Sequence, residues 1–539
     1  MSRPGLLRSL ASVSGGTFVS RILGLVREQA IAWAFGANAA TDAFWVAFRI
    51  PNFLRRLFAE GSFSVAFVPV FTEYKETRSP EELRELVART AGTLGGVLLV
   101  VTALGVAAAG WLARGFAPGS IDEPAKLALT TDLLRVTFPF LLFVSLTALA
   151  AGALNSFHRF LLPALTPVIL NLCMIAGALW AAPYFDVPIM ALGWAILAAG
   201  VLQLLVQLPA LRGLGLLALP RWGWKHPGVR RILKLMVPTL FGSSVAQVNL
   251  LLDTLIASFL ISGSQTWLAQ SDRLLEFPLG LFGVALGTVI LPSLSRHHVA
   301  TDGAAFARAL DWGLRTALLI AVPAMIALAM LARPLLATLL QHGRFTAHDV
   351  DMASLSLSAL ALGLPAFALV KVVAPAFYAR QDTTTPVRAG IAAMVANMVL
   401  NVLLVGVLFA LWHGPDDLGG GWLVAISRVP GLHMALALAS AIASWLNLAL
   451  LWRALRRDGI YLRQPGWGAH LLRLGAACVA MALVLAIGLH HWPDWSAWSP
   501  LRRVVRLAVL VAAGGGTFLA VLVACGFRLR HLRADQAAG

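Results

Sequence analysis

The chain has 539 residues, of which 59% are apolar and 12% are charged, and its mean hydropathy is +0.80. Soluble globular proteins carry about 25% charged residues, so this composition excludes an ordinary water-soluble domain. The net charge of +17 does not indicate nucleic-acid binding, because Lys and Arg lie mostly in short segments between apolar stretches rather than on one solvated face. The composition predicts a multi-pass membrane protein with no nucleic-acid partner.

A helix that crosses the hydrocarbon core of a bilayer needs roughly 20 mostly apolar residues. In chain order, stretches of this length predict an all-α protein with fourteen transmembrane helices. The first, second, seventh and eighth are the least hydrophobic, so a plain hydropathy count can miss them. The predicted spans are 15–36, 40–71, 87–113, 129–154, 162–182, 187–210, 231–262, 266–295, 309–333, 351–379, 386–411, 432–453, 468–490 and 503–526.

The distribution of Lys and Arg among the connecting segments predicts the orientation of these spans. With a cytoplasmic N-terminus, basic residues on the cytoplasmic side outnumber those outside by about three to one, as the positive-inside rule requires. Arg502, Arg503 and Arg506 fit least well, because they fall on the outside. An even number of spans then places both termini on the cytoplasmic side of the membrane.

A faint internal repeat predicts the domain organisation. Residues 28–33 resemble residues 253–258, and two proline-centred matches recur at nearly the same offset. A duplicated six-helix unit would place two lobes of like orientation around a central cationic cavity, an arrangement known among transporters. The predicted parts are an N-lobe at 1–210, an interfacial cytoplasmic linker at 211–230, a C-lobe at 231–453, and two further helices with a cytoplasmic tail at 454–539.

Several predicted spans carry ionisable side chains, each of which costs roughly 2.5–3.5 kcal/mol at the centre of a bilayer. Lipid cannot solvate them, so they must face a polar interior. The planar guanidinium fork of arginine binds oxyanions bidentately. The cluster therefore predicts a pocket for an anionic, phosphate-bearing substrate. Its members are Arg21, Arg27, Glu28, Asp42, Arg49, Asn52, Arg55, Arg56, Glu60, Asp253, Asp272, Arg273, Glu276 and Lys371.

Spacing indicates how the second span displays these groups. Five of them are separated by seven, three, four and four residues, which places them on one stripe of a helix: Asp42, Arg49, Asn52, Arg56 and Glu60. An alternative interpretation is a salt-bridge network that only holds the helices together, since the acids can neutralise nearby arginines. Both interpretations stay open at this point. The sequence has no phosphate-binding glycine-rich loop of the Walker A type, which argues against ATP hydrolysis by this chain.

Several short motifs resemble those of the MurJ (MviN) family of lipid II flippases, within the MOP superfamily of exporters. They lie at 20–24, 41–44, 49–61, 272–278 and 377–383, and the resemblance extends from the first span to about residue 530. The family has two six-helix lobes and two additional helices. The resemblance therefore implies translocation of the lipid-linked peptidoglycan precursor from the cytoplasmic to the periplasmic leaflet of the bacterial inner membrane. This translocation would serve cell-wall synthesis, and the cell-wall synthesis machinery would be a partner of the protein.

The resemblance also assigns roles to residues. It implies that Arg27, Arg55 and Arg273 hold the substrate's pyrophosphate, and that Arg21, Asp42 and Glu60 are functionally sensitive. Some members bind sodium, for which the matching positions are Asp253, Asn397 and Asn401, with the membrane potential as another coupling source. Two features differ from the family pattern. Glu28 stands where some relatives have an aspartate, and the segment 412–431 is longer than is usual in the family.

Three other functions remain as alternatives. One is a flippase for a different undecaprenyl-pyrophosphate glycan, against which the motif at 49–61 argues. Another is a membrane enzyme that acts on polyprenyl phosphates, which would need acidic residues exposed at one loop face. The third is a drug exporter, whose cavity would favour acids and aromatic residues over arginines.

Overall fold

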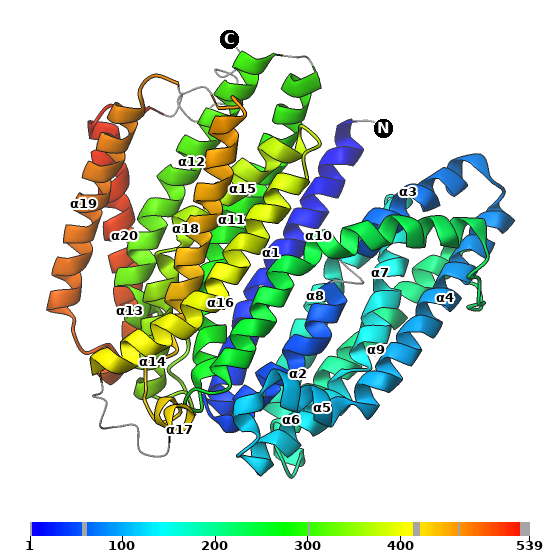
Figure 1. The fold of residues 1–539 in the computed structure, drawn as a ribbon, viewed down its shortest axis with the longest axis horizontal. Helices are drawn as coiled ribbons and strands as arrows, with labels where there is room; N and C mark the ends of the chain where they lie inside the picture. The colour runs from blue at the N-terminus through cyan, green and yellow to red at the C-terminus, as the bar shows by residue number, and fades with distance from the viewer. Residues whose placement is uncertain (1–2, 57–61, 300–301, 413–420, 462–463, 529–539) are drawn as a thin grey trace. The chain divides into compact units, whose positions relative to one another are not determined.

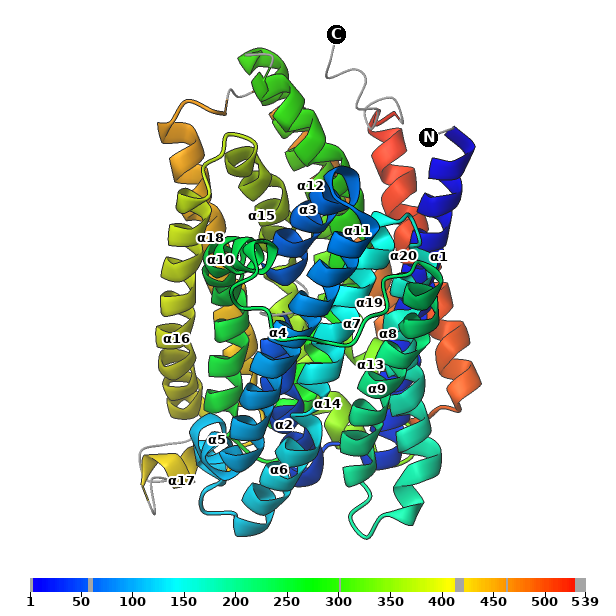
Figure 2. The same cartoon turned by 90° about the vertical axis from the view of Figure 1, so that its right-hand side faces the viewer.

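The structure is a computed structural model that describes residues 3–56, 62–299, 302–412, 421–461 and 464–528. Throughout these ranges the regular elements are helices (Figures 1 and 2). The chain divides into two compact units, residues 1–263 and residues 264–539.

The described residues of the first unit form ten α-helices. The prediction placed the second span at 40–71, and Glu60 within it lies outside the described residues. The helices of this unit are α1 (Arg3–Phe35), α2 (Ala39–Arg55), α3 (Ser62–Thr77), α4 (Pro80–Ala107), α5 (Ala109–Phe116), α6 (Pro124–Thr137), α7 (Phe140–Ser156), α8 (Leu161–Ala176), α9 (Met190–Gly213) and α10 (Pro227–Ala257).

Ten α-helices also form in the part of the second unit that the structure describes, and the last two, α19 and α20, pack side by side (Figure 1). Its helices are α11 (Ser264–Val299), α12 (Gly303–Met330), α13 (Ala332–Leu339), α14 (Ala347–Ala361), α15 (Leu364–Tyr378), α16 (Thr384–Trp412), α17 (Trp422–Ile426), α18 (Met434–Arg457), α19 (Trp467–His491) and α20 (Pro500–Ala524).

Nine helical segments of the described chain are long and apolar enough to cross a membrane, and α14 with α15 makes a tenth if the pair, bent by 40°, is one span. These ten correspond to ten of the fourteen predicted spans. The other four predicted spans fall on α1, on α2 and α3, on α10 and on α11. They are the four that the sequence marks as least hydrophobic, because their ionisable residues lower the mean hydropathy.

Local sequence signals begin several of these helices. Asn38 starts α2 with a capping box, in which its side chain accepts the backbone N–H of Thr41 and the Thr41 hydroxyl accepts the backbone N–H of Asn38. Ser79 and Glu82 form the same reciprocal pair at the start of α4. These caps satisfy N–H groups that would otherwise lack a partner at a helix end.

Each unit has its own apolar core. In the first, Phe63, Phe67 and Phe71 of α3 stack along one face and pack against α4 and α7. In the second, α12, α15 and α18 bury their apolar faces against one another. The compact units divide after Gly263, so α10 packs with α2 and α3 although the predicted C-lobe begins at 231. A division of the chain by compactness need not coincide with a division by internal sequence repeat. The predicted lobe boundaries therefore stay a prediction.

Candidate substrate-binding site

The charged residues of α1 lie at its interface with α8. The side chains of Arg27 and Glu28 are 5% and 3% exposed and form an ion pair. Arg27 also donates to Asn171 Oδ1 of α8 at 3.0 Å, and Asn171 Nδ2 donates to the backbone carbonyl of Ser20 at 3.0 Å. The guanidinium is therefore held by partners on both helices, while Arg21 is half-buried one and a half turns earlier.

The stripe of polar residues on α2 is buried in the first part of the helix, where residues 41–51 are all buried. Arg49, which is 8% exposed, donates to the Thr254 hydroxyl of α10 at 2.6 Å. This bond joins the middle of α2 to α10, within one unit. The expected display of these side chains on one face of a helix is consistent with Arg49 and Asp42 both contacting the α10 region.

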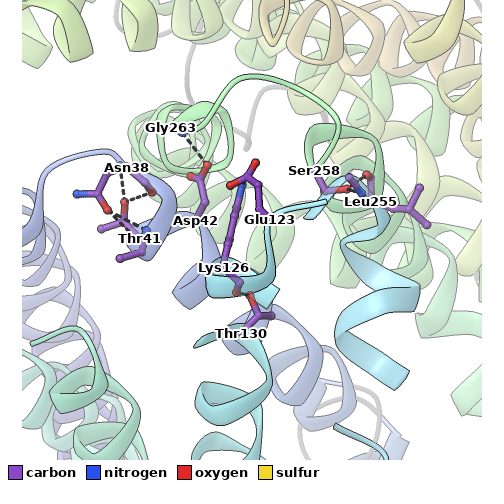
Figure 3. Close-up of polar contacts among 11 residues, drawn as sticks. Asn38, Thr41, Asp42, Glu123, Lys126, Thr130, Leu255, Ser258 and Gly263 are labelled. Carbon is purple, nitrogen blue, oxygen red and sulfur yellow. Dashed lines mark hydrogen bonds and ion pairs between the residues drawn. The ribbon is translucent and has the colours of Figure 1, made fainter. Parts of the chain in front are cut away.

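Asp42 contacts the turn at the end of the first unit. Its Oδ2 accepts the backbone N–H of Gly263 at 2.7 Å, in the turn that follows α10 (Figure 3). Nearby, the Ser258 hydroxyl accepts the backbone N–H of Gly119 at 3.1 Å. Figure 3 also shows Lys126, a buried residue whose ammonium lies 3.9 Å from the Glu123 carboxylate. The contacts made by Asp42 indicate that it fixes the turn after α10.

The end of α2 displays its polar groups differently. Arg55 donates through Nε to Asn52 Oδ1 at 2.9 Å, and both side chains are half-buried. Arg56 is half-buried as well and caps the helix. These residues are thus more accessible than Arg27 and Arg49, although they were predicted as members of the same site.

In the second unit, α11 carries Arg273, the third arginine that the family resemblance assigns to the pyrophosphate. Arg273 forms an ion pair with Glu276 at 3.1 Å, and the two side chains are 36% and 57% exposed. The two residues lie three positions apart on α11. Because the side chain of Arg273 is 36% exposed, its guanidinium is partly accessible. An accessible arginine next to a carboxylate can exchange that partner for a phosphate oxyanion without unfolding anything.

The three residues predicted to bind sodium occupy two separate units. Asp253 of α10 accepts the side-chain N–H of Asn249 at 3.3 Å. Asn397 and Asn401 are buried one turn apart on α16, and Asn397 donates to the Ser440 hydroxyl of α18 at 3.4 Å. Carboxylate, amide and hydroxyl oxygens are the donors that hard cations prefer. The donor chemistry therefore fits a sodium ion.

Sequence reasoning missed three residues of this network: Asn171, Thr254 and Gly263. Asn171 carried a usable signal, because an asparagine inside an otherwise apolar span needs a partner on another helix. Thr254 follows Asp253 directly, but its contact with Arg49 depends on how α2 packs against α10. The role of Gly263 lies in its backbone N–H, for which a sequence gives no signal.

Together, the fold and these buried polar groups define a polytopic α-helical membrane protein whose ionisable residues are stabilised inside the helical bundle, as they are in transporters. Comparison with known proteins is more specific. Residues 31–413 match the family model described as lipid II flippase MurJ. The chain is 44% identical over 98% of its length to a probable lipid II flippase MurJ of Vibrio cholerae, covering 98% of that protein, and 41% identical to the lipid II flippase MurJ of Burkholderia cenocepacia, with 98% and 99% coverage.

Solved structures show the same relationship. A structure titled lipid II flippase MurJ, inward closed conformation, superposes with a TM-score of 0.75 at 26% identity, covering 95% of this chain and 99% of the other. An inward-facing MATE family transporter of the MOP superfamily superposes with a TM-score of 0.63 at 12% identity, covering 84% and 98%, which shows a shared fold alone. The chain belongs to the MurJ family of lipid II flippases.

Proposed function

We propose that this protein flips lipid II, the undecaprenyl-pyrophosphate-linked peptidoglycan precursor, from the cytoplasmic to the periplasmic leaflet, and that cell-wall synthesis depends on it. It is a transporter and not an enzyme. The observation that carries the proposal is membership of the family along 98% of the chain, combined with arginines on α1, α2 and α11 at the positions that the family resemblance assigns to pyrophosphate.

The contacts of these arginines support a role in oxyanion binding. Arg55 and Arg273 are partly accessible and have neutral or exchangeable neighbours, Asn52 and Glu276. Arg27 is buried with Glu28 and Asn171. Binding of pyrophosphate to Arg27 would then require the guanidinium to turn from the Glu28 carboxylate, which would need another donor because a buried charge without a partner is costly. The proposed site is completed by Arg21, Asp42, Arg49, Arg56 and Glu60.

The mechanism that we propose is alternating access, by rocking of the two predicted six-helix lobes. The hydrogen bond from Gly263 to Asp42 and the bond from Arg49 to Thr254 are short polar contacts that hold α2 to α10. A change of access in this unit would have to break or remake such contacts. Substrate binding would bias that change only through contacts that differ between the two states.

The location and topology belong to the same proposal. The protein is a multi-pass bacterial membrane protein, and we place it in the inner membrane with both termini in the cytoplasm. Fourteen spans follow if the four charged helical segments cross the membrane together with the ten apolar ones. Contact with the cell-wall synthesis machinery would deliver the flipped precursor to the enzymes that use it.

We further propose that a sodium ion or the membrane potential drives the return of the empty carrier. The family resemblance assigns the ion to Asp253, Asn397 and Asn401; within the second unit, the oxygens of Asn397 and Asn401 would hold it. Sodium binding should raise the melting temperature of the purified protein relative to potassium at equal ionic strength. The same melting temperature in both salts would contradict a sodium site.

The decisive experiment replaces the native flippase of a bacterial cell with this gene and measures how much lipid II is open to an externally added enzyme that cleaves it. Wild type should restore cleavage. Arg55→Ala and Arg273→Ala should reach the membrane at normal levels but restore little cleavage, because both side chains are partly accessible and their loss should not unfold the protein.

Two matched variants make the result interpretable. Arg135→Ala removes an exposed arginine whose partner is Asp132, and it should rescue like wild type. Arg27→Lys keeps a buried charge but loses the bidentate fork, so it should insert and yet transport poorly. If wild type leaves lipid II inside, the proposed function is wrong. If the arginine variants rescue fully, the proposed site is wrong although the function stands.

A further inference from the structure

A segment of the first unit, residues 214–226, lies along α4 and is here called the strap. Backbone and side-chain hydrogen bonds attach it at successive turns of the helix. The N–H of Arg221 donates to Ala88 O at 2.9 Å, and the N–H of Gly223 donates to Thr93 Oγ1 at 3.0 Å. Arg89 of α4 donates in turn to Trp222 O at 2.8 Å. Hydrogen bonds therefore hold the strap against α4 as part of the fold.

Small residues of α4 make this close approach possible. A side chain at Gly92 would collide with the backbone of Arg221, and one at Gly96 would collide with the ring of Trp222. Arg89 is the last ionisable residue of α4 before an apolar stretch that continues to Ala107. It therefore marks the level at which the polar interface gives way to hydrocarbon, and Gly96 lies about 10 Å deeper along the helix.

The outer side of the strap is apolar and aromatic. Trp222 and Trp224 are 58% and 52% exposed, their rings stack with centroids 6.4 Å apart, and Leu219 is 82% exposed. Exposed leucines would be unfavourable in water over such a continuous surface. Tryptophans at this level are typical of the membrane interface, where an apolar ring with a polar N–H is best accommodated. The exposed side of the strap thus has the composition of a surface at the membrane interface.

The same region carries an excess of positive charge. Residues 214–252 contain five Lys and Arg and no acidic residue. Arg231 is paired with Glu73 at 2.8 Å and Arg89 with Glu85 at 3.2 Å. Among the residues that the structure describes, Lys225 makes no ion pair and is exposed. Its charge is available to an anion at the surface.

These features converge on one pocket. It has a volume of about 820 Å³ and is lined by Arg89, Trp222, Gly223, Trp224, Lys225 and His226. We infer that this pocket binds the headgroup phosphate of an anionic glycerophospholipid, with Lys225 as its principal cation and the two tryptophan rings against the glycerol and upper acyl chains. Charge complementarity with a phosphodiester and the interfacial level of the pocket carry the assignment. The lipid is a bound neighbour of the protein and not its transported substrate.

Native mass spectrometry of the full-length protein in mixed micelles tests this inference directly. The probes are phosphatidylglycerol and phosphatidylcholine with identical acyl chains. Wild type should bind phosphatidylglycerol at least about fivefold more tightly, the gain expected from one cation near the headgroup. Lys225→Gln should abolish that preference, and Trp224→Leu should weaken the binding of both lipids. Both residues are exposed, so both variants should keep the melting temperature of wild type.

Arg114→Gln is the matched control, because Arg114 also lies over a tryptophan, Trp111, in the same unit but outside the pocket. It should leave the preference unchanged. The inference is overturned if wild type binds the two lipids equally or if Lys225→Gln keeps the preference. It is also overturned if inorganic phosphate displaces phosphatidylglycerol at equal concentration, or if an undecaprenyl-pyrophosphate lipid takes the same pocket in preference. None of these outcomes bears on whether the protein flips lipid II.

Discussion

The charged helices of the first unit and the hairpin of α19 and α20 in the second place their polar residues in opposite ways. On α1 and α2, Arg27, Glu28 and Arg49 are buried; Arg27 and Arg49 bond to neighbouring helices, and Glu28 pairs with Arg27. The hairpin is apolar along its middle, and its buried polar contacts lie near its ends. Polar contacts at the ends of a hairpin anchor it, whereas those inside a helix constrain how that helix can move.

Two anchors hold the hairpin. Near the start of α19, the buried Asp311 of α12 accepts from Tyr461 at 3.0 Å and from Trp467 at 2.6 Å, and it pairs with Arg315 at 2.7 Å. Burial raises the pKa of the Tyr461 phenol to about 12, so it remains a donor at physiological pH. Near the start of α20, Arg503 donates to backbone carbonyls that follow or end α13.

Breaking the first anchor should give the largest effect. Asp311→Ala leaves one cation and two partly buried donors without their shared, buried acceptor, so it should destabilise the protein by about 3 kcal/mol. Thermal unfolding of the purified protein measures the change. The control, Asp132→Ala, removes a carboxylate whose pair with Arg135 is exposed, and it should cost less than about 1 kcal/mol. Equal losses in the two variants would show that the Asp311 network is not an anchor.

The second anchor should matter somewhat less. Arg503→Met removes a guanidinium that donates to Ala337, Gln341 and Ser496, and a loss of about 2–3 kcal/mol is expected for a charged donor. Limited proteolysis at the turn before α20 should become faster. The neighbouring Arg502→Met alters an exposed side chain and serves as the control. No difference in proteolysis between the two variants would contradict the anchor.

A change inside the α1–α8 interface sharpens the comparison. Asn171→Leu removes the bonds to Arg27 and to Ser20 O, and it should cost only about 1–2 kcal/mol because Glu28 still pairs with Arg27. We nevertheless expect it to reduce transport more than Asp311→Ala does at equal protein level. Leu172→Ala, on the exposed side of α8, is the control. Wild-type transport by Asn171→Leu would remove Asn171 from the site.

The smallest effect is expected at Asp382, between α15 and α16. Hydrogen bonding from Thr385, supported by the N–H of Thr384, lowers the pKa of the Asp382 carboxyl below its ordinary value. Its contribution to stability is therefore present above the unfolded-state pKa and is lost as the pH falls through the folded-state pKa. Asp382→Ala should cost about 1 kcal/mol at pH 7 and less at pH 3.

Melting curves at the two pH values test this prediction, with Asp382→Asn as the control that retains an acceptor oxygen. A loss in Asp382→Ala that is the same at both pH values would contradict a role for the ionised carboxylate.

Much of the fold was predictable because it depends on local pattern. Ten of the predicted spans correspond to apolar helical segments, since mean hydropathy is a local property. A count by hydropathy alone misses the four predicted spans whose ionisable residues lower the mean hydropathy, which fall on α1, on α2 and α3, on α10 and on α11. Arg503 and Arg506 also fit the charge rule poorly for a structural reason: Arg503 binds carbonyls, and Arg506 lies 3.7 Å from the ring centroid of Trp498.

The candidate site, like the fold, has features that follow from local sequence and features that depend on tertiary contacts. The sequence by itself determined which residues are too polar for lipid, including Arg27, Arg49 and Asp42, because that cost depends on residue type and on the length of the surrounding apolar stretch. Only the tertiary structure decided their partners, since Asn171, Thr254 and the N–H of Gly263 are 144 to 221 residues away along the chain. A buried charge must find a partner, but the packing of the helices selects which partner it finds.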